Sequence, residues 1–338
     1  MVELARHAQR QGRRVTVAAP PGPFDADLRD LGVPRRPLQE RRRSAPGAVL
    51  TALALARVVG DVQPTVIHAH NPKMTVVAHA ARRLARRRSR LVATFHGGDR
   101  REDGRAARLL RLADHVVCVD DELAERMSDA GVPDCRVTVI RNGTSPAAAL
   151  DPDERRRLCG ELGLTGPVVA SVGELVRSKA VDRFLRAAAH VAAEHPDARF
   201  LVVGDGPLRG DLERLAADLG LTDRVRFAGR RRDARALIGV SAVVVSTSES
   251  EGLSLVALET LAAGVPLVAP DVGGMRGLLA TGAGVLVTDT DPGTVGAAVA
   301  GVLRSPDRAG SMGAAGRALV AAEHDLDRML RSYAGLYR

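Results

Sequence analysis

The chain has 338 residues, of which 45% are hydrophobic, 26% charged and 2% aromatic, and its formal net charge is +9. This length is enough for about two domains of ordinary size, and no uninterrupted apolar run is as long as a membrane span. The cysteines Cys118, Cys135 and Cys159 have no paired metal-ligand spacing, and no signal peptide is apparent. We therefore expect a reducing, cytoplasmic setting.

The positive charge admits nucleic acid, anionic lipid or phosphorylated substrates as partners. Nucleic-acid modules usually stack bases on aromatic side chains, so the scarcity of aromatic residues argues against a nucleic-acid partner. Arginine runs at 41–43 and 86–88 are typical of a solvated surface. The alternative is a surface that meets anionic lipid or a lipid-linked acceptor. Only two lysines are present, Lys73 and Lys179.

Short apolar runs alternate with longer helix-like segments, which indicates parallel α/β sheets. The segment "VDRFLRAAAHVAAEHP" is one example of helical periodicity between two such runs. The predicted strands are, in chain order, 14–19, 65–69, 91–95, 115–119, 137–140, 168–172, 199–203, 225–228, 242–246, 266–269 and 284–287.

Turn residues cluster in "NGTSPAAALDPDERRR", which predicts a domain boundary there. We expect two doubly wound Rossmann-like domains, residues 1–148 and 149–320, facing a cleft, with ligands bound beyond the carboxyl ends of the strands. The opening "MVELARHAQRQGRRVTVAAP" starts in a helix-like segment, although such a domain should begin with a central strand and a glycine-rich loop. Either the domain lacks this strand by nature, or the chain begins too late; we favour the second reading.

The stretch "SESEGLSLVALETLAAGVPLVAP" (248–270) places Glu251 and Glu259 eight positions apart. A helix is predicted to begin near Gly252 to Ser254, which puts Glu259 two turns in, roughly 12 Å from Glu251 if the span is helical. The helix start offers free N–H groups and a positive dipole end for a diphosphate. Glu259 on a ribose and Glu251 facing a sugar would suit a nucleotide sugar. An acidic residue at a helix start plus a surface glutamate is the alternative, and spacing does not separate the two.

"EGLSLVALE" followed by "AAGVPLVAPDVGG" resembles the E-x7-E motif of the retaining family-4 (group 1) glycosyltransferases of the GT-B fold. Further segments resemble that family in its order: "VTVAAP", "VIHAHNP", "ATFHG", "VPDCRVTVIRNG", "LVVGDGPLR" and "RVRFAGRRRD". The resemblance covers nearly the whole chain. It implies a GT-B fold without its first strand and glycine-rich loop, and a C-terminal helix in 321–338 that crosses back to the first domain.

The resemblance places Lys179, in "SVGELVRSKAVD", on the donor diphosphate, where it stabilises the charge of the leaving group. A solvated lysine at a helix start is the alternative. The family has an arginine where this chain has Glu174, and a carboxylate near a diphosphate repels it. Arg177 would then take over the arginine's role, or Glu174 would point away.

The remaining site residues also follow from the resemblance. His96 is expected to act near the transferred sugar, beside Lys179 and Glu251 as the catalytic residues; a capped strand end is the alternative. Gly204, Asp205 and Gly206 can equally form an ordinary tight turn. The expected donor-side residues are Gly173, Arg177, Lys179, Gly204, Asp205, Gly206, Gly229, Arg230, Glu251, Gly252, Leu253, Ser254 and Glu259. The expected acceptor-side residues are His70, Asn71, His96 and Gly97.

The resemblance implies transfer of a sugar from a nucleotide-diphosphate sugar, with UDP favoured, to a hydroxyl of a glycan, lipid-linked or small-molecule acceptor. It implies retention of configuration and neither cofactor nor metal; His68 and His70 lack a third zinc ligand nearby. Glu174 keeps open a catalytically impaired nucleotide-sugar-binding protein or an epimerase on the same fold. A third reading, a protein that binds anionic polymers, predicts steeply salt-dependent DNA binding. The basic first domain also suggests peripheral contact with an anionic inner membrane face.

Overall fold

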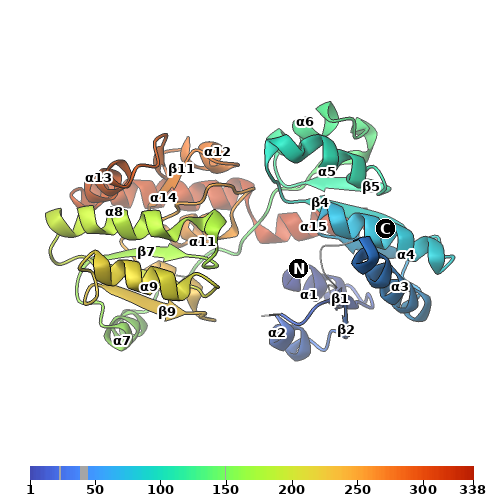
Figure 1. The fold of residues 1–338 in the computed structure, drawn as a ribbon, viewed down its shortest axis with the longest axis horizontal. Helices are drawn as coiled ribbons and strands as arrows, with labels where there is room; N and C mark the ends of the chain where they lie inside the picture. Colours follow the sequence, from blue (N-terminus) through green and yellow to red (C-terminus); the bar gives the residue numbers. More distant parts are fainter. Residues whose placement is uncertain (23, 39–44, 149) are drawn as a thin grey trace. The chain divides into compact units, whose positions relative to one another are not determined.

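The computed structural model describes residues 1–22, 24–38, 45–148 and 150–338 (Figure 1). It consists of two compact units, residues 1–141 with 327–338, and residues 142–326. All the paired strands of the described residues are parallel, so the α/β prediction is confirmed. None of the described helices is long and apolar enough to cross a membrane. The predicted arginine surface at 41–43 lies outside the described residues.

The first unit contains two separate parallel sheets. Strands β1 and β2 pair only with each other, and the second sheet has the order β3-β4-β5-β6. The elements are α1 (Val2–Arg10), β1 (Val17–Ala19), α2 (Asp25–Asp30), β2 (Arg35–Pro37), α3 (Ala45–Val62), β3 (Val66–Ala69), α4 (Pro72–Leu84), β4 (Arg90–Phe95), η1 (Arg100–Glu102), α5 (Asp103–Leu110), β5 (His115–Cys118), α6 (Asp121–Asp129), η2 (Asp134–Arg136), β6 (Val137–Val139) and α15 (Leu326–Leu336).

Two details of the first unit differ from the sequence prediction. Strand β1 covers only Val17–Ala19 of the predicted 14–19, and β2 was not predicted at all. The sequence of β2 is Arg-Arg-Pro, and it has no apolar run because its side chains are half-buried or exposed. Its extended conformation depends on pairing with β1, in a register that runs from Val17–Arg35 to Ala19–Pro37. Such pairing between distant residues cannot be recognised from the local composition.

A polar network joins α15 to the larger sheet of the first unit. His68 on β3 forms hydrogen bonds through Nε2 with Thr94 Oγ1 at 2.7 Å and through Nδ1 with the Tyr337 hydroxyl at 2.7 Å. Thr94 also contacts the Tyr333 hydroxyl at 3.1 Å. Burial, with a smaller contribution from His96, lowers the pKa of His68 to about 3. His68 is therefore neutral at physiological pH, and it anchors the C-terminal helix as a hydrogen-bonding group.

We predict that the His68 network makes the chain sensitive to acid. The pKa of a histidine in an unfolded chain is about 6.5. Below that pH the unfolded state binds a proton at His68, whereas the folded state binds it only near pH 3. The stability from neutral His68 is therefore complete above about pH 6.5 and lost as the pH falls. Thermal unfolding between pH 7.5 and 4.5 should show a shallower fall for His68→Asn than for the parent.

The control for this prediction is His190→Asn, because His190 is an exposed residue of the second unit. It should leave the pH dependence of the melting temperature unchanged. A His68→Asn variant that loses stability with falling pH as steeply as the parent would contradict the assignment.

The second unit is a doubly wound domain with one six-stranded parallel sheet, order β12-β11-β10-β7-β8-β9. Its elements are α7 (Pro152–Leu162), β7 (Val168–Val172), η3 (Arg177–Lys179), α8 (Val181–Glu194), β8 (Arg199–Val203), α9 (Arg209–Asp218), β9 (Val225–Gly229), α10 (Ala234–Val240), β10 (Val243–Val245), α11 (Leu255–Ala263), β11 (Leu267–Pro270), α12 (Met275–Leu279), β12 (Gly284–Val287), α13 (Pro292–Leu303) and α14 (Pro306–Glu323).

This strand order makes the second unit a Rossmann-type domain. Counted within the unit, it is the dinucleotide-binding order 3-2-1-4-5-6, whose direction reverses between β7 and β10. Ligands in such sheets bind in the crevice beyond the carboxyl ends of the two strands at this reversal. The loops that follow Val172 and Val245 are therefore the expected ligand-binding region of this unit.

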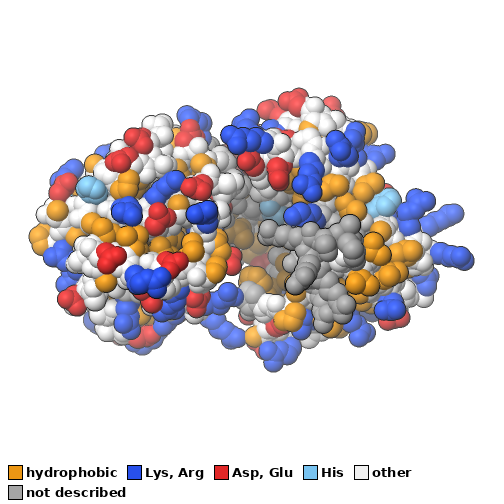
Figure 2. Space-filling view, viewed as in Figure 1, with side chains coloured by type: hydrophobic (Ala, Val, Ile, Leu, Met, Phe, Trp, Pro, Cys, Tyr) orange, Lys and Arg blue, Asp and Glu red, His pale blue; other side chains and the backbone are white. Residues whose placement is uncertain are grey.

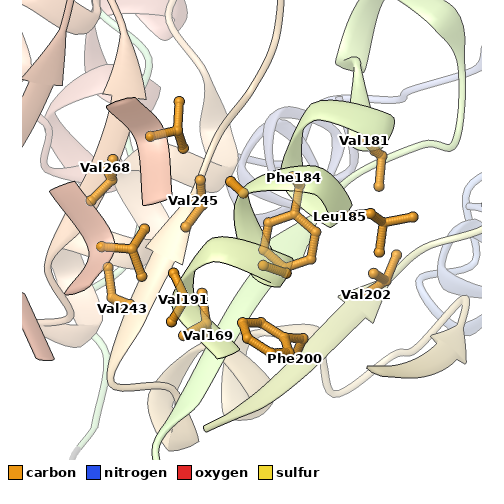
Figure 3. Close-up of a cluster of buried hydrophobic side chains, with 14 of the residues drawn as sticks. Val169, Val181, Phe184, Leu185, Val191, Phe200, Val202, Val243, Val245 and Val268 are labelled. Atoms are coloured by element: carbon orange, nitrogen blue, oxygen red, sulfur yellow. The ribbon is translucent and has the colours of Figure 1, made fainter. Parts of the chain in front are cut away.

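The core of the second unit lies between the sheet and helices α8 and α13, which pack side by side (Figure 1). Phe184 on α8 and Phe200 on β8 meet edge to face at 6.4 Å between ring centroids, surrounded by valines of β7, β10 and β11 (Figure 3). Burying each such side chain contributes about 1.5–3 kcal/mol. The central strands are thus held rigidly, and the loops at their ends have a fixed base.

Candidate functional site

Two loops meet at the strand reversal of the second unit, and an ion pair joins them. Lys179, the last residue of η3 after β7, pairs through Nζ with Glu251 Oε1 in the loop after β10. Ser248 donates a hydrogen bond to the same oxygen at 2.9 Å. The two charged side chains are only 30% and 13% exposed, so solvent screens their attraction less than that of a surface pair.

Thr247 fixes the backbone that carries Lys179. Its hydroxyl donates to the carbonyl oxygens of Lys179 at 3.0 Å and of Ala180 at 2.9 Å, and its side chain is buried. Ala180 has a φ of 45°, a left-handed conformation that costs energy for a residue other than glycine. The threonine bonds offset this cost, so the loop after β10 sets the position of the lysine on the loop after β7.

A small cavity adjoins the ion pair. Its lining includes Gly173, Lys179, Ser246, Glu251 and Ser254, and its volume is about 30 Å³. That volume has room for about two water molecules. Lys179 and Glu251 both line the cavity, so an anion that binds to Lys179 here competes with the Glu251 carboxylate.

Helix α11 begins beside this cavity with a capped start. Ser254 is the N-cap and accepts a hydrogen bond from the Ala257 N–H at 3.4 Å. The other N–H groups of a first helical turn have no partner within the helix, and the helix dipole makes this end positive. Lys179 and the start of α11 together place positive charge beside the cavity, which is the arrangement that suits an anion.

The helix starts later than the sequence analysis assumed. Residues 251–254 are not helical and α11 begins at Leu255, so Glu259 lies one turn into the helix and not two. The estimate of roughly 12 Å for a helical span therefore does not apply. The residues before Leu255 are held by tertiary contacts, such as the Leu253 carbonyl that accepts from Asn142 Nδ2 at 3.0 Å.

Glu259 is not among the residues that line the cavity. Its carboxylate lies 4.0 Å from Arg235 Nε on α10. Burial raises the pKa of Glu259, while Arg235 opposes this shift. The two glutamates of the motif therefore have different cationic partners, Lys179 for the first and Arg235 for the second.

The glycines after β7 and β8 allow these loops to pack against each other. A side chain at Gly204, whose φ is 141°, would clash with the Gly173 carbonyl oxygen. A side chain at Gly206 would lie 2.5 Å from the Leu175 carbonyl oxygen. Asp205 accepts from the Gly206 N–H at 2.8 Å through its carboxylate and from the Leu175 N–H at 3.0 Å through its carbonyl. The loops after β7 and β8 therefore pack closely against each other.

Two further donor-side candidates lie at the end of β9. The Gly229 carbonyl accepts a hydrogen bond from the Gly204 N–H at 2.8 Å, which connects the end of β9 to the loop after β8. Arg230 is exposed. Neither residue lines the cavity at Lys179.

Glu174 does not line this cavity. Its side chain is exposed, and neither Glu174 nor Arg177, which is also exposed, is part of the lining. The two possibilities left open by the sequence, a role for Arg177 and a Glu174 directed away from the diphosphate, therefore both remain predictions.

The acceptor-side candidates gather at the carboxyl ends of β3 and β4 in the first unit. The rings of His70 and His96 are stacked, with centroids 5.9 Å apart and planes 14° from parallel. Asn71 caps α4, since its Oδ1 accepts from the Met74 N–H at 2.8 Å. Gly97 follows directly with a φ of 99°. Within the described residues no three His, Cys, Asp or Glu side chains form a metal-binding group.

Several residues of the site were missed by sequence reasoning. Thr247 and Ser248 lie in the run "STSES" at 246–250, so the polar stretch after a buried strand was a usable signal. Arg235 and Asn142 are remote in sequence from the residues that they contact. No local pattern marks them, because only the tertiary fold brings them to the loops.

The sequence matches two family descriptions. "Glycosyltransferase Family 4" matches residues 1–148 and "Glycosyl transferases group 1" matches residues 160–319. The chain is also 32% identical over 286 residues to the GDP-mannose-dependent alpha-(1-6)-phosphatidylinositol monomannoside mannosyltransferase of Mycolicibacterium smegmatis, an alignment that covers 79% of this chain and 74% of that protein.

The chain belongs to the group 1, family 4 glycosyltransferases. Its fold is that of the Anabaena protein Alr3699/HepE crystallised with UDP and glucose, with a TM-score of 0.86, 21% identity and coverage of 99% of this chain and 94% of that one. The alpha-D-kanosaminyltransferase of Streptomyces kanamyceticus is 34% identical over 175 residues, 51% of this chain and 45% of that protein. The predicted GT-B fold and glycosyltransferase activity are thereby confirmed.

We predict that Glu251 competes with a nucleoside diphosphate for Lys179 in this glycosyltransferase. Glu251→Gln should strengthen the binding of free UDP or GDP about fivefold, since the lysine no longer has to leave a carboxylate. Lys179→Met should weaken the same binding about tenfold or more. Isothermal titration with each nucleoside diphosphate measures both effects.

Glu249→Gln is the matched control, because Glu249 is two positions away and pairs instead with Arg183 at 2.7 Å. It removes the same charge and should change the affinity less than twofold or so. Lys73→Met is the corresponding control for the lysine. If Glu249→Gln strengthens binding as much as Glu251→Gln, the effect is a general field effect and the competition is refuted.

Proposed function

We propose that this glycosyltransferase moves a sugar from a nucleotide-diphosphate sugar to a hydroxyl acceptor, with retention of configuration and without a metal ion. The observation that carries the proposal is the Lys179–Glu251 pair beside the capped start of α11. It stands at the strand reversal where a Rossmann-type sheet binds its ligand.

Each part of the site has a role in this proposal. The diphosphate binds to the start of α11 and to Lys179, which leaves Glu251 when the donor enters. Glu251, released from the lysine, accepts hydrogen bonds from hydroxyls of the transferred sugar. Glu259, oriented by Arg235, accepts from the ribose hydroxyls. The packed glycine loops after β7, β8 and β9 support the nucleotide, with Gly229 and Arg230 near the base.

The chemical step leaves the nucleoside diphosphate as the leaving group. The bond between the anomeric carbon and the diphosphate oxygen breaks, and that oxygen takes both bonding electrons. The acceptor oxygen attacks the anomeric carbon from the same face, and its proton passes to the departing phosphate oxygen. Positive charge already positioned at Lys179 and the helix start stabilises the charge that develops there. This is the role a metal ion has in other transferases.

The donor is either a UDP-sugar, which we favour, or GDP-mannose. Alr3699/HepE, which shares the fold, was crystallised with UDP-glucose, whereas the M. smegmatis relative is named as GDP-mannose-dependent. On the acceptor side, relatives are named for phosphatidylinositol monomannoside and for D-inositol 3-phosphate. We therefore propose a polyhydroxy acceptor, lipid-linked, glycan or small, bound by His70, Asn71, His96 and Gly97.

Nucleotide binding and turnover test the proposal together. One of UDP, GDP, ADP and dTDP should raise the melting temperature in a concentration-dependent way, because binding to the native state alone stabilises by mass action. The corresponding nucleotide sugar should then release its diphosphate only when an inositol or inositol-lipid acceptor is present. EDTA should have no effect, and the new glycosidic bond should have the anomeric configuration of the donor.

Lys179→Met should lower turnover about 100-fold or more, since it removes the prepositioned positive charge. Binding of a nucleotide without acceptor-dependent release would refute transfer and favour a binding protein. Turnover of the Lys179→Met enzyme at the parent rate would refute the role of the lysine.

A further inference from the structure

Only the first unit has a net positive charge. Residues 1–141 with 327–338 contain 29 Lys and Arg against 17 Asp and Glu, a net charge of +12. Residues 142–326 contain 20 against 23, a net charge of −3. The donor site lies in the second unit, so binding of a nucleotide sugar does not account for this asymmetry.

The exposed apolar side chains are concentrated in the same unit. Among the described residues, six of the seven large hydrophobic side chains that are exposed belong to it, and Leu255 is the exception. The six are Met1, Phe24, Val49, Leu50, Leu53 and Leu84, with exposed fractions between 42% and 58%. Figure 2 shows hydrophobic side chains gathered over α3 and α4, with Lys and Arg side chains beside them.

Helix α3 is apolar on two opposite sides. Its inner stripe, Leu55 and Val59, is buried, and the helix packs against α4. Its outer stripe carries Val49, Leu50 and Leu53, which are 58%, 47% and 42% exposed. A soluble helix normally has polar residues on its outer side, so this stripe marks a candidate interaction surface.

The C-terminal end of α4 adds positive charge to the same pair of helices. Leu84, the last helical residue, is 55% exposed, and Arg83 and the run 86–88 around it are exposed. Arg82 pairs with Asp114. By contrast, Arg83 and the three arginines at 86–88 form no ion pair within the described residues. Their charge is available to an external anion.

We propose that the outer side of α3 and the C-terminal end of α4 form a surface that binds an anionic lipid bilayer. The aliphatic side chains enter the interface between headgroups and acyl chains, and the arginines contact acidic headgroups. A nucleic acid would use the arginines but would leave the aliphatic stripe in water. A second copy of the chain would bring two units of +12 together, which like-charge repulsion opposes.

This inference deepens the acceptor side of the proposed function, because an enzyme held on a bilayer meets a lipid-linked acceptor directly. The binding test needs neither donor nor acceptor. Failure of membrane binding and failure of sugar transfer can therefore be told apart.

The experiment is co-sedimentation of the full chain with vesicles of phosphatidylcholine alone or mixed with phosphatidylglycerol. The parent should bind only the mixed vesicles, and the binding should weaken as salt is raised. The variant R86S/R87S/R88S should lose about 100-fold in partitioning, since each basic residue near an anionic surface contributes roughly fivefold. L50S/L53S should lose about tenfold at every salt concentration. All these side chains are exposed, so the melting temperatures should remain close to that of the parent.

R186S/R226S/R308S is the matched control, because it removes three exposed arginines from the second unit. It should bind like the parent. Equal losses in the two triple variants would overturn the proposal, as would equal binding to phosphatidylcholine alone or no binding to the mixed vesicles. Two other results would also overturn it: a dimer in sedimentation velocity that L50S/L53S abolishes, and binding to a DNA fragment as tight as that to the vesicles.

Discussion

The attraction between Lys179 and Glu251 is the interaction on which the second unit's site depends. The pair connects the loop after β7 to the loop after β10, at the one place where the strand order of the sheet reverses. Thr247 and Ser248 support its two ends through hydrogen bonds to the Lys179 carbonyl and the Glu251 carboxylate. The rigid core behind these loops, centred on Phe184 and Phe200, keeps this geometry in place.

The same pair occupies the position that the proposed ligand needs. Both side chains line a cavity of about 30 Å³, and leaving a partly buried lysine without an anionic partner is unfavourable. A phosphate that replaces the carboxylate leaves Lys179 paired. In the proposed function, this exchange also releases Glu251 for the sugar. One substitution of partners would then prepare both the leaving group and the transferred group.

Much of this site follows from the sequence, and the limits have physical causes. The central strands were predictable because parallel strands buried on both faces are continuous apolar runs, and those of the second unit are present within one residue of their predicted ends. The E-x7-E spacing and the rarity of lysine pointed to Glu251 and Lys179. Strand β2, the late start of α11 and the contacts of Arg235 and Asn142 were not predictable, because each is decided by residues far away in sequence. The sequence motif also did not reveal that its two glutamates pair with different cations.

The exchange of partners at Lys179 is tested most directly by NMR of lysine side chains, since the chain has only two lysines. With 13C-labelled lysine, the Cε–Hε signals of Lys73 and Lys179 can be assigned from a Lys73→Arg variant and followed as UDP or GDP is added. The account predicts that the Lys179 signal shifts on saturation with the nucleotide that binds, while the Lys73 signal stays in place, and that Glu251→Gln shifts the Lys179 signal before any nucleotide is added. A Lys179 signal that is unchanged at saturating nucleotide would show that the lysine keeps its carboxylate partner and would contradict the central claim.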